Sequence, residues 1–264
     1  MAGRIRCVMH VVAVVALHGV VPFDLAIPCE VFGRATAPGR KAPYEVRVCG
    51  EEDVVRSRCF GLRVSWHLND IIGADTVIVP GVEDVSAPIP EAVIAALRAA
   101  ANRGARIASI CSGAFVLAAA GLLDNMRATT HWLAARALKA RCPLVHVDAD
   151  VLFVDNGQIL TSAGAAAGLD LCLHLVRRDL GSAAAADAAR LAVMPLERAG
   201  GQAQFIVHAP PSSAASLDPV LQWLADHLHQ PIALDGMARR AGTTPRTSAA
   251  ASASRPAPPR CNGF

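Results

Sequence analysis

The stretch "ARIASICSGAFVLAAAGLLD", Ala105–Asp124, decides the fold. The residues from Ala105 to Ile110 are mostly apolar and indicate a short buried strand, and the small apolar residues after Cys111 favour a helix. A strand that runs directly into a helix is the repeating unit of parallel α/β sheets. Cys111 would then lie on a sharp turn, with its side chain at the N-terminus of the helix.

The same alternation of strand and helix continues on both sides of this stretch. Apolar or alternating runs predict strands at Cys7–Leu17, Tyr44–Gly50, Ala74–Gly81 and within Asp53–Trp66 and Leu144–Gly164. Helical spacing of apolar residues, with Pro at first turns and Gly after the ends, predicts helices at Pro22–Phe32, Ile89–Gly104, His131–Cys142, Ala165–Gly181 and Ser182–Pro195. We therefore expect an α/β fold with a doubly wound, mostly parallel sheet and flanking helices.

Two turns and one sheet edge can also be assigned. The segment Asp53–Trp66 predicts a further strand or a hairpin that turns at Gly61, and Asn156–Gly157 predicts a tight turn between strands. Parallel sheets bind ligands at the carboxyl ends of their strands. That edge would bring Cys111, the Pro80–Gly81 turn and Asp24 together.

The composition is that of a globular protein. Of 264 residues, 53% are hydrophobic and 18% are charged, which is ample for a large core. No apolar run reaches the ~18 residues of a membrane span, and the run at Cys7–Leu17 lacks the cleavage site of a signal peptide. The eight cysteines form no C-x-x-C pair and match no zinc framework. We expect a cytoplasmic protein with no metal, no cofactor and no membrane partner.

A second, smaller unit is predicted at the C-terminal end of the sequence. Residues 1–195 would form the α/β domain, residues 196–216 a linker rich in Gly, Pro and Ser, and residues 217–264 a helical segment. The helical segment has two amphipathic helices followed by "GTTPR" at 242–246, which is the pattern of a partial helix-turn-helix.

The charge of the chain is unevenly distributed. The net charge is only +3, but the sequence after Asp235 holds five arginines and no acidic residue. A basic end on a mildly acidic body indicates a nucleic-acid contact or, alternatively, a solvated tail. If this end contacts DNA, the candidate residues are Arg239, Arg240, Thr244 and Arg246.

The motif at Cys111 has its own chemistry. A helix N-terminus lowers the pKa of a thiol and stabilises an anion, and neighbouring backbone amides can hold an oxyanion. These effects would make Cys111 a nucleophile or a ligand contact. The alternative is a structural cysteine, because buried cysteines at strand ends are common.

Several motifs together resemble the PfpI-type domain of the class I glutamine-amidotransferase-like superfamily. They are "PFDLAIPCEVF", "VIVPG", "SICSGAFVLAAAGLLDNMRATTHW", "TSAGAAAGLDLCLHLVRRDLG" and "GGQAQF", in the family's order between about Val8 and Phe205. The sequence more narrowly resembles regulators in which this domain precedes an AraC-type DNA-binding domain. The segment Leu217–Arg246 is similar to the first half of such a DNA-binding domain.

The resemblance implies roles for six residues. Cys111 takes the position of the elbow cysteine, Asp24 that of an acidic residue beside the thiol, and His131 that of a pocket histidine. The backbone amides of Ser112 and of Gly81 or Val82 would be oxyanion donors. Without the resemblance, Asp24 and His131 are ordinary residues at helix N-termini.

The sequence departs from the family pattern in two places. Family proteases have His after the elbow cysteine, where this sequence has Ser112, so proteolysis is not expected. An AraC-type domain is longer than the segment after Leu217, and "SAAASASRPAPPR" replaces its expected run of Arg, Leu and Phe. One hypothesis is a frameshift near Thr247, which would leave an incomplete domain that binds DNA weakly and through phosphates.

The sequence therefore predicts a transcriptional regulator that senses a small, nitrogenous metabolite as its effector and contacts DNA. By analogy with the superfamily it would form a homodimer. The alternative is an enzyme, a cysteine-dependent hydratase or amidase similar to isonitrile hydratases, in which Cys111 attacks and Asp24 moves a proton. A third possibility is a stable remnant without function.

Overall fold

The structure is a computed structural model that describes residues 9–37, 42–195, 198, 200, 201, 204 and 223. Its contacts divide the chain into two compact units, Met1–Ile206 and Val207–Phe264. The first unit contains every helix and strand discussed below. The predicted helix-turn-helix segment, with Arg239, Arg240, Thr244 and Arg246, lies outside the described residues.

A seven-stranded sheet forms the centre of the first unit, in the order β10-β11-β7-β6-β1-β2-β5. All neighbours are parallel except β10 and β11. The strands are β1 (His10–Ala16), β2 (Tyr44–Gly50), β5 (Trp66–His67), β6 (Thr76–Val79), β7 (Arg106–Ile110), β10 (Phe153–Asp155) and β11 (Ile159–Ser162). Two smaller pairs are β3 (Val54–Arg56) with β4 (Gly61–Arg63) and β8 (Arg127–Ala128) with β9 (His146–Val147).

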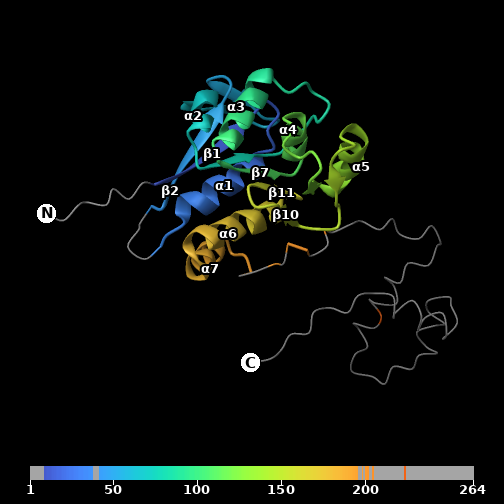
Figure 1. Ribbon diagram of the computed structural model, residues 1–264. Coiled ribbons are helices and arrows are strands. Elements are labelled where there is room, and N and C mark those ends of the chain that lie inside the picture. The colour runs from blue at the N-terminus through green and yellow to red at the C-terminus, as the bar shows by residue number, and fades with distance from the viewer. Residues whose placement is uncertain are drawn as a thin grey trace, which may run out of the picture. The chain divides into compact units, whose positions relative to one another are not determined.

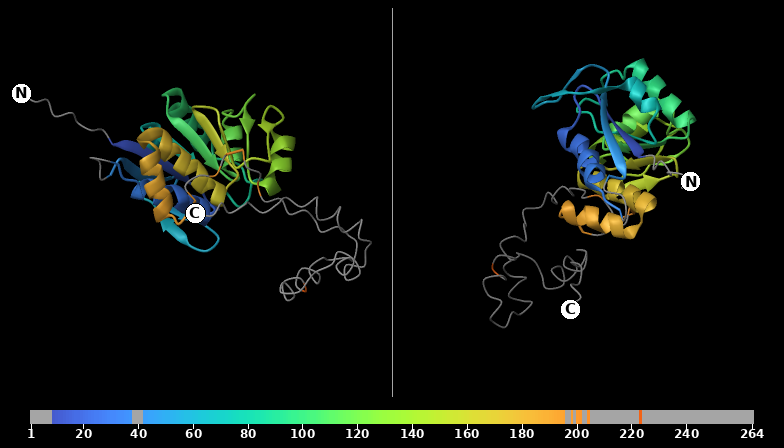
Figure 2. Two further views of the ribbon diagram at one scale, coloured as in Figure 1. Left: turned by 90° about the horizontal axis from the view of Figure 1, so that it is seen from below. Right: turned by 90° about the vertical axis from the view of Figure 1, so that its left-hand side faces the viewer.

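Helices cover both faces of this sheet (Figure 1). One face packs against α1 (Pro22–Arg34), α6 (Ala166–Leu180) and α7 (Ser182–Leu191). The other packs against α2 (Leu68–Ile72), α3 (Glu91–Asn102), α4 (Gly113–Ala119) and α5 (Trp132–Arg141). The turned views show the same three layers (Figure 2). The doubly wound α/β fold predicted from the sequence is confirmed.

Alternating burial in the central strands explains these layers. In β1, Val12 and Val14 face the layer of α1 and α6, whereas Ala13 and Val15 face the layer of α3. All four side chains are at most 1% exposed. A strand covered on both faces must be apolar at every position, which is why this segment shows a continuous apolar run.

The structure corrects two local expectations. The hairpin turns at Ser57–Phe60 rather than at Gly61. Gly61 is the first residue of β4 and pairs with Arg56 of β3. The Ser57 hydroxyl donates to the carbonyl of Phe60 (3.0 Å) and accepts from its amide (3.2 Å), so this turn closes without a glycine. Helix α4 is also shorter than expected, since it ends at Ala119 and Gly121 has a φ of 70°.

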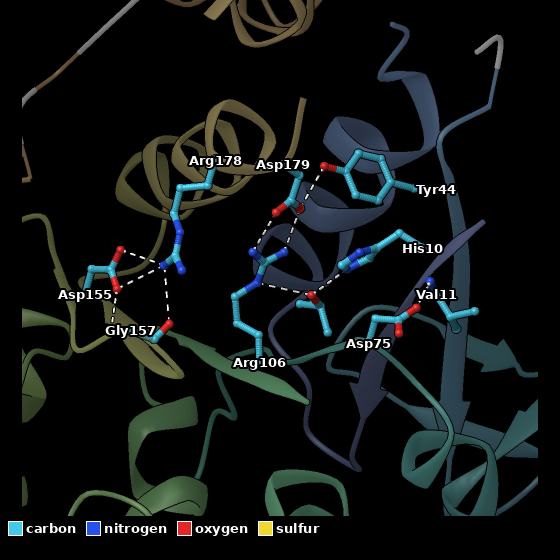
Figure 3. Close-up of polar contacts among 10 residues, drawn as sticks. His10, Val11, Tyr44, Asp75, Arg106, Asp155, Gly157, Arg178 and Asp179 are labelled. Atoms are coloured by element: carbon cyan, nitrogen blue, oxygen red, sulfur yellow. Dashed lines mark hydrogen bonds and ion pairs between the residues drawn. The ribbon is translucent and has the colours of Figure 1, made fainter. Parts of the chain in front are cut away.

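A polar network joins the first residues of four parallel strands to the end of α6 (Figure 3). Arg106 donates two hydrogen bonds to Asp179, at 2.8 and 2.7 Å, and a third to the Thr76 hydroxyl. Tyr44 donates to Asp179 (2.9 Å), and the His10 ring lies 2.8 Å from the Thr76 hydroxyl. The network fastens α6 to the edge of the sheet opposite to Cys111.

In the part of the chain that the structure describes, every helix is too short or too polar to cross a membrane.

Candidate functional site

Cys111 lies on the turn between β7 and α4, as the sequence predicted. Its φ is +56°, a left-handed conformation that costs a non-glycine residue about 1–3 kcal/mol. The backbone is held in this shape from both sides. The amide of Cys111 donates to the carbonyl of Ser162 (3.0 Å), and its own carbonyl accepts from the Thr130 hydroxyl (2.8 Å). The turn aims a partly accessible thiol at the carboxyl edge of the sheet.

Asp24 comes to this thiol from the first turn of α1. Its side chain is 1% exposed, and Oδ1 accepts a hydrogen bond from the amide of Ala165 (3.1 Å). The other oxygen, Oδ2, is buried without a hydrogen-bond partner, and the Cys111 thiol and the Gly81 amide lie close to this carboxyl. The structure therefore brings together the cysteine and the carboxylate that the sequence analysis paired.

Two glycines permit this close approach. A Cβ on Gly164 would lie 2.3 Å from Cβ of Cys111, and a Cβ on Gly81 would lie 2.5 Å from Oδ2 of Asp24. Neither space can hold a side chain. Gly164 also has a φ of 85°, which favours glycine by itself.

The ionisation of Cys111 differs from the sequence expectation. Burial raises the pKa of the thiol to about 12, and the neighbouring Asp24 carboxylate adds to the rise. The Ser112 amide opposes it, but a single donor at the start of a short helix is outweighed by burial and by a negative neighbour. The expected lowering of the thiol pKa by the helix N-terminus is therefore wrong, and the resting side chain is a neutral thiol.

Asp24 is also affected by its surroundings. Burial raises the pKa of this carboxyl, while hydrogen bonds from Ala165, Cys111 and Gly81 and the nearby His131 ring oppose the rise. A buried carboxyl beside a thiol is suited to accept and return a proton.

Ser112 fastens the turn to the loop after β6. Its hydroxyl donates to the Val82 carbonyl (2.7 Å) and accepts from the Val82 amide (2.8 Å). The Val82 amide is therefore occupied, which removes it as an oxyanion donor. Of the candidates from the sequence, the Ser112 amide faces the thiol and the Gly81 amide faces Asp24.

His131 lies at the N-terminus of α5 and on the wall of a small cavity. Its Nδ1 accepts from the amide of Leu133 (3.4 Å), so the ring caps the helix. The cavity has a volume of about 170 Å³. Its lining includes Gly164 and Ala165, whose backbones contact Cys111 and Asp24. His131 thus belongs to the pocket wall and also has the structural role that the sequence left open.

Sequence reasoning did not assign roles to Thr130, Arg198 and Gln204. Gln204 is 8% exposed and binds the "TTHW" segment through several hydrogen bonds. Arg198 makes a two-point ion pair with the buried Asp170 of α6, at 3.0 and 2.5 Å. Both line the cavity. The motif "GGQAQF" contains Gln204 and was the available signal in the sequence. A glutamine side chain forms hydrogen bonds in many settings, so the motif alone did not show which partners Gln204 has.

The described residues contain no group of three or more His, Cys, Asp or Glu that could hold a metal ion.

Comparisons with known proteins agree with this geometry. A profile of the DJ-1/PfpI family matches residues 10–178. The HTH-type transcriptional regulator GlxA of Rhizobium meliloti is 36% identical over 156 residues, which are 57% of this chain and 47% of that protein. The isonitrile hydratase of Pseudomonas putida is 32% identical over 166 residues, or 62% of this chain and 66% of that protein.

Solved structures show the same fold. An AraC family transcriptional regulator from Pseudomonas putida superposes with a TM-score of 0.61 at 20% identity, over 69% of this chain and 99% of that structure. The match to GlxA spans about half the length of that regulator.

Proposed function

Because the chain belongs to the DJ-1/PfpI family, we propose that it is a cytoplasmic transcriptional regulator whose α/β unit senses a small nitrogenous metabolite. Its relatives include HTH-type transcriptional regulators that share this domain. The observation that carries the proposal is the small cavity lined by Gly164 and Ala165, whose backbones contact the Cys111–Asp24 pair.

The protonated thiol favours sensing over turnover. Burial and the neighbouring Asp24 raise the pKa of the thiol far above neutral pH, and the thiolate is the reactive form. The cavity of about 170 Å³ is below the ~300–1,000 Å³ of pockets for drug-sized ligands. An effector of a few heavy atoms fits this space.

A thermal-shift screen tests the sensing role. Amines, amino acids and isonitriles are added to the wild-type chain and to Cys111→Ala. A sensor pocket binds one class and raises the melting temperature of both chains, since the thiol contributes contact rather than chemistry. If no compound shifts the wild-type chain, the sensing role is wrong.

DNA contact by the C-terminal segment belongs to the same proposal. Five arginines without an acidic residue would bind phosphates, with Arg239, Arg240, Thr244 and Arg246 as the candidates. Binding would be weak, would discriminate poorly between sequences and would fall steeply with salt. Tight, sequence-specific binding that resists salt would contradict this part.

Dimerisation is proposed on family analogy only, and sedimentation measures it.

A hydratase is the second candidate, favoured by the left-handed Cys111 turn and by the facing Asp24. In that reaction Sγ would add to the terminal carbon of an isonitrile, and the thiol proton would pass through Asp24 to the same carbon. Water would then displace the sulfur from this carbon. One proton of the water would go to the nitrogen and the other to the sulfur, so that the N-substituted formamide leaves and the thiol is regenerated. The likeness to the Pseudomonas putida isonitrile hydratase supports it. Formamide production by the wild-type chain that is lost in Cys111→Ala would establish the enzyme.

A further inference from the structure

We propose that Gln204 is a positioning residue that couples the cavity beside Cys111 to the chain that leads into the second unit. The proposal rests on the sensing function above and adds a route by which the occupied pocket changes the rest of the chain. It is carried by the hydrogen bonds of Gln204, by its place on the cavity wall and by its place in the sequence.

Gln204 uses both ends of its buried amide. Its Oε1 accepts from the amide of Trp132 (3.0 Å), at the first residue of α5. Its Nε2 faces three acceptors, the Thr129 hydroxyl (3.2 Å), the Thr130 carbonyl (3.2 Å) and the Val151 carbonyl (3.0 Å). One side chain therefore holds the start of α5 and the residues before it against the segment that leads into β10.

This contact extends to Cys111 through one residue. The Thr130 carbonyl accepts from Gln204, and the Thr130 hydroxyl donates to the Cys111 carbonyl (2.8 Å). Thr130 is fully buried, so neither bond can be replaced by water. The strained Cys111 turn and Gln204 are thus linked by two consecutive hydrogen bonds.

The same side chain lies on the wall of the cavity. Arg198, His131 and Trp132 line that wall with Gln204. Leu152 also lines the cavity, and its amide donates to the carbonyl of Gly200 (2.7 Å). Any molecule that fills the cavity therefore touches the residues that hold this part of the chain in place.

The position in the sequence gives the coupling its direction. The first unit ends at Ile206 and the second begins at Val207. Gln204 lies two residues before this boundary, so its hydrogen bonds hold the chain close to the point where the second unit begins. A ligand that shifts or stiffens the Gln204 contacts changes the anchor of the second unit, and by linkage the anchor changes ligand affinity equally.

The experiment uses the full chain and iodoacetamide, because carbamidomethylation of Cys111 places a small group at the pocket. Hydrogen exchange is measured on peptides covering residues 129–133 and 198–206, before and after modification. Cys111→Ala treated in the same way corrects for reaction at other thiols. In the wild-type chain, modification should change exchange at 198–206.

Two variants isolate Gln204 from general stability. Gln204→Met keeps the size of the side chain and removes its hydrogen bonds. Gln158→Met is the matched control, since the Gln158 amide also donates to two carbonyls, at Ala101 and Ala105, away from the cavity. Gln204→Met should exchange about tenfold faster at 129–133, because losing one or two net hydrogen bonds shifts local opening by that factor.

The response to Cys111 modification decides the proposal. It should vanish in Gln204→Met and persist in Gln158→Met. If Gln204→Met does not fold, Thr130→Val provides the second test, because it cuts the link to Cys111 and leaves the Gln204 side chain in place. If modification of Cys111 changed exchange at 198–206 equally in the wild-type chain and in Gln204→Met or Thr130→Val, the coupling would be overturned. Unchanged exchange at 198–206 in a wild-type chain whose Cys111 is shown by mass spectrometry to be modified would also overturn it. Both readouts concern the first unit, so loss of DNA binding leaves them unaffected.

Discussion

Asp24 and Cys111 share one buried space, and their charged forms oppose each other. Burial raises the pKa of both groups, and a carboxylate beside a thiolate would place two like charges in contact. The pair therefore holds at most one negative charge near neutral pH. Because burial and the Asp24 carboxylate together raise the pKa of the thiol to about 12, the thiol is the neutral member of the pair.

The charge of Asp24 can be tested through the reactivity of Cys111. Replacing Asp24 by Asn removes the negative neighbour, so the pKa of the thiol should fall and alkylation by iodoacetamide at pH 7–9 should accelerate. The rate should rise by about tenfold for each unit of pKa lowered. Mass spectrometry of the Cys111 peptide measures the rate, with the exposed Cys59 as the internal reference. A slower reaction would mean that Asp24 activates the thiol at rest, as the hydratase reading requires.

Gly164 tests the packing of the same turn. Alanine at this position meets Cβ of Cys111 at 2.3 Å and must adopt a φ of 85°. Gly157 is a matched control, since its φ is 88° but an added Cβ meets nothing within 4 Å. Urea unfolding should show a loss of about 1–2 kcal/mol for Gly157→Ala, from conformation alone. Gly164→Ala should lose at least about 3 kcal/mol. Equal losses would show that the turn can relax.

At the scale of elements, α6 connects the two edges of the sheet. Its first turn follows Ala165, which binds Asp24, and Gly168 packs against Ile110 of β7. Its middle holds Asp170, the buried partner of Arg198. Its last turn holds Asp179 in the network of Figure 3. The helix is thus fixed at three levels, and its position sets the distance between Asp24 and Cys111.

The Asp179 network should depend on pH. Burial by itself would raise the pKa of Asp179, but hydrogen bonds and charge from Arg106 and a hydrogen bond from Tyr44 lower it below the usual value. The stabilisation is therefore present above about pH 4 and is lost as pH falls through the lowered pKa. Asp179→Asn should cost about 2–4 kcal/mol at pH 7, because it leaves a mostly buried Arg106 unpaired.

Urea unfolding between pH 7 and pH 2.5 measures this difference. The gap between Asp179→Asn and the wild-type chain should narrow in acid, once Asp179 is protonated in both states. Asp187→Asn is the control, since Asp187 pairs with Arg190 on an exposed surface of α7 and such pairs contribute little. A gap that stays constant down to pH 2.5 would show that the charge of Asp179 is not what stabilises the helix.

At the scale of the molecule, the sequence predicted what depends on local pattern. Continuous apolar runs identified β1, β6 and β7, and the direct step from strand to helix placed Cys111 on its turn. The pattern could not reveal β8, which has only two residues and depends on tertiary pairing. Nor could it rank burial against the helix N-terminus at Cys111, because burial depends on Asp24 and Gly164, far away in the sequence.

Local sequence pattern also could not predict where along the chain the first unit ends. The Gly- and Pro-rich composition after residue 195 predicts a linker, yet Arg198, Gly200 and Gln204 make specific contacts with α6, β10 and the "TTHW" segment. Composition reports that a segment lacks regular structure. It does not report whether the side chains of that segment have partners elsewhere.

Two truncations follow from these contacts. A chain ending at Ile206 keeps Arg198 and Gln204, and should match the full chain in the urea midpoint of its α/β unit. A chain ending at Pro195 leaves Asp170, whose side chain is 5% exposed, without its partner and removes the bonds to Trp132 and Thr130. It should lose about 3–5 kcal/mol, since an unpaired buried charge is costly. Asp170→Asn in the shorter chain should recover part of this loss. Equal midpoints for both truncations would show that residues 196–206 contribute nothing to the fold.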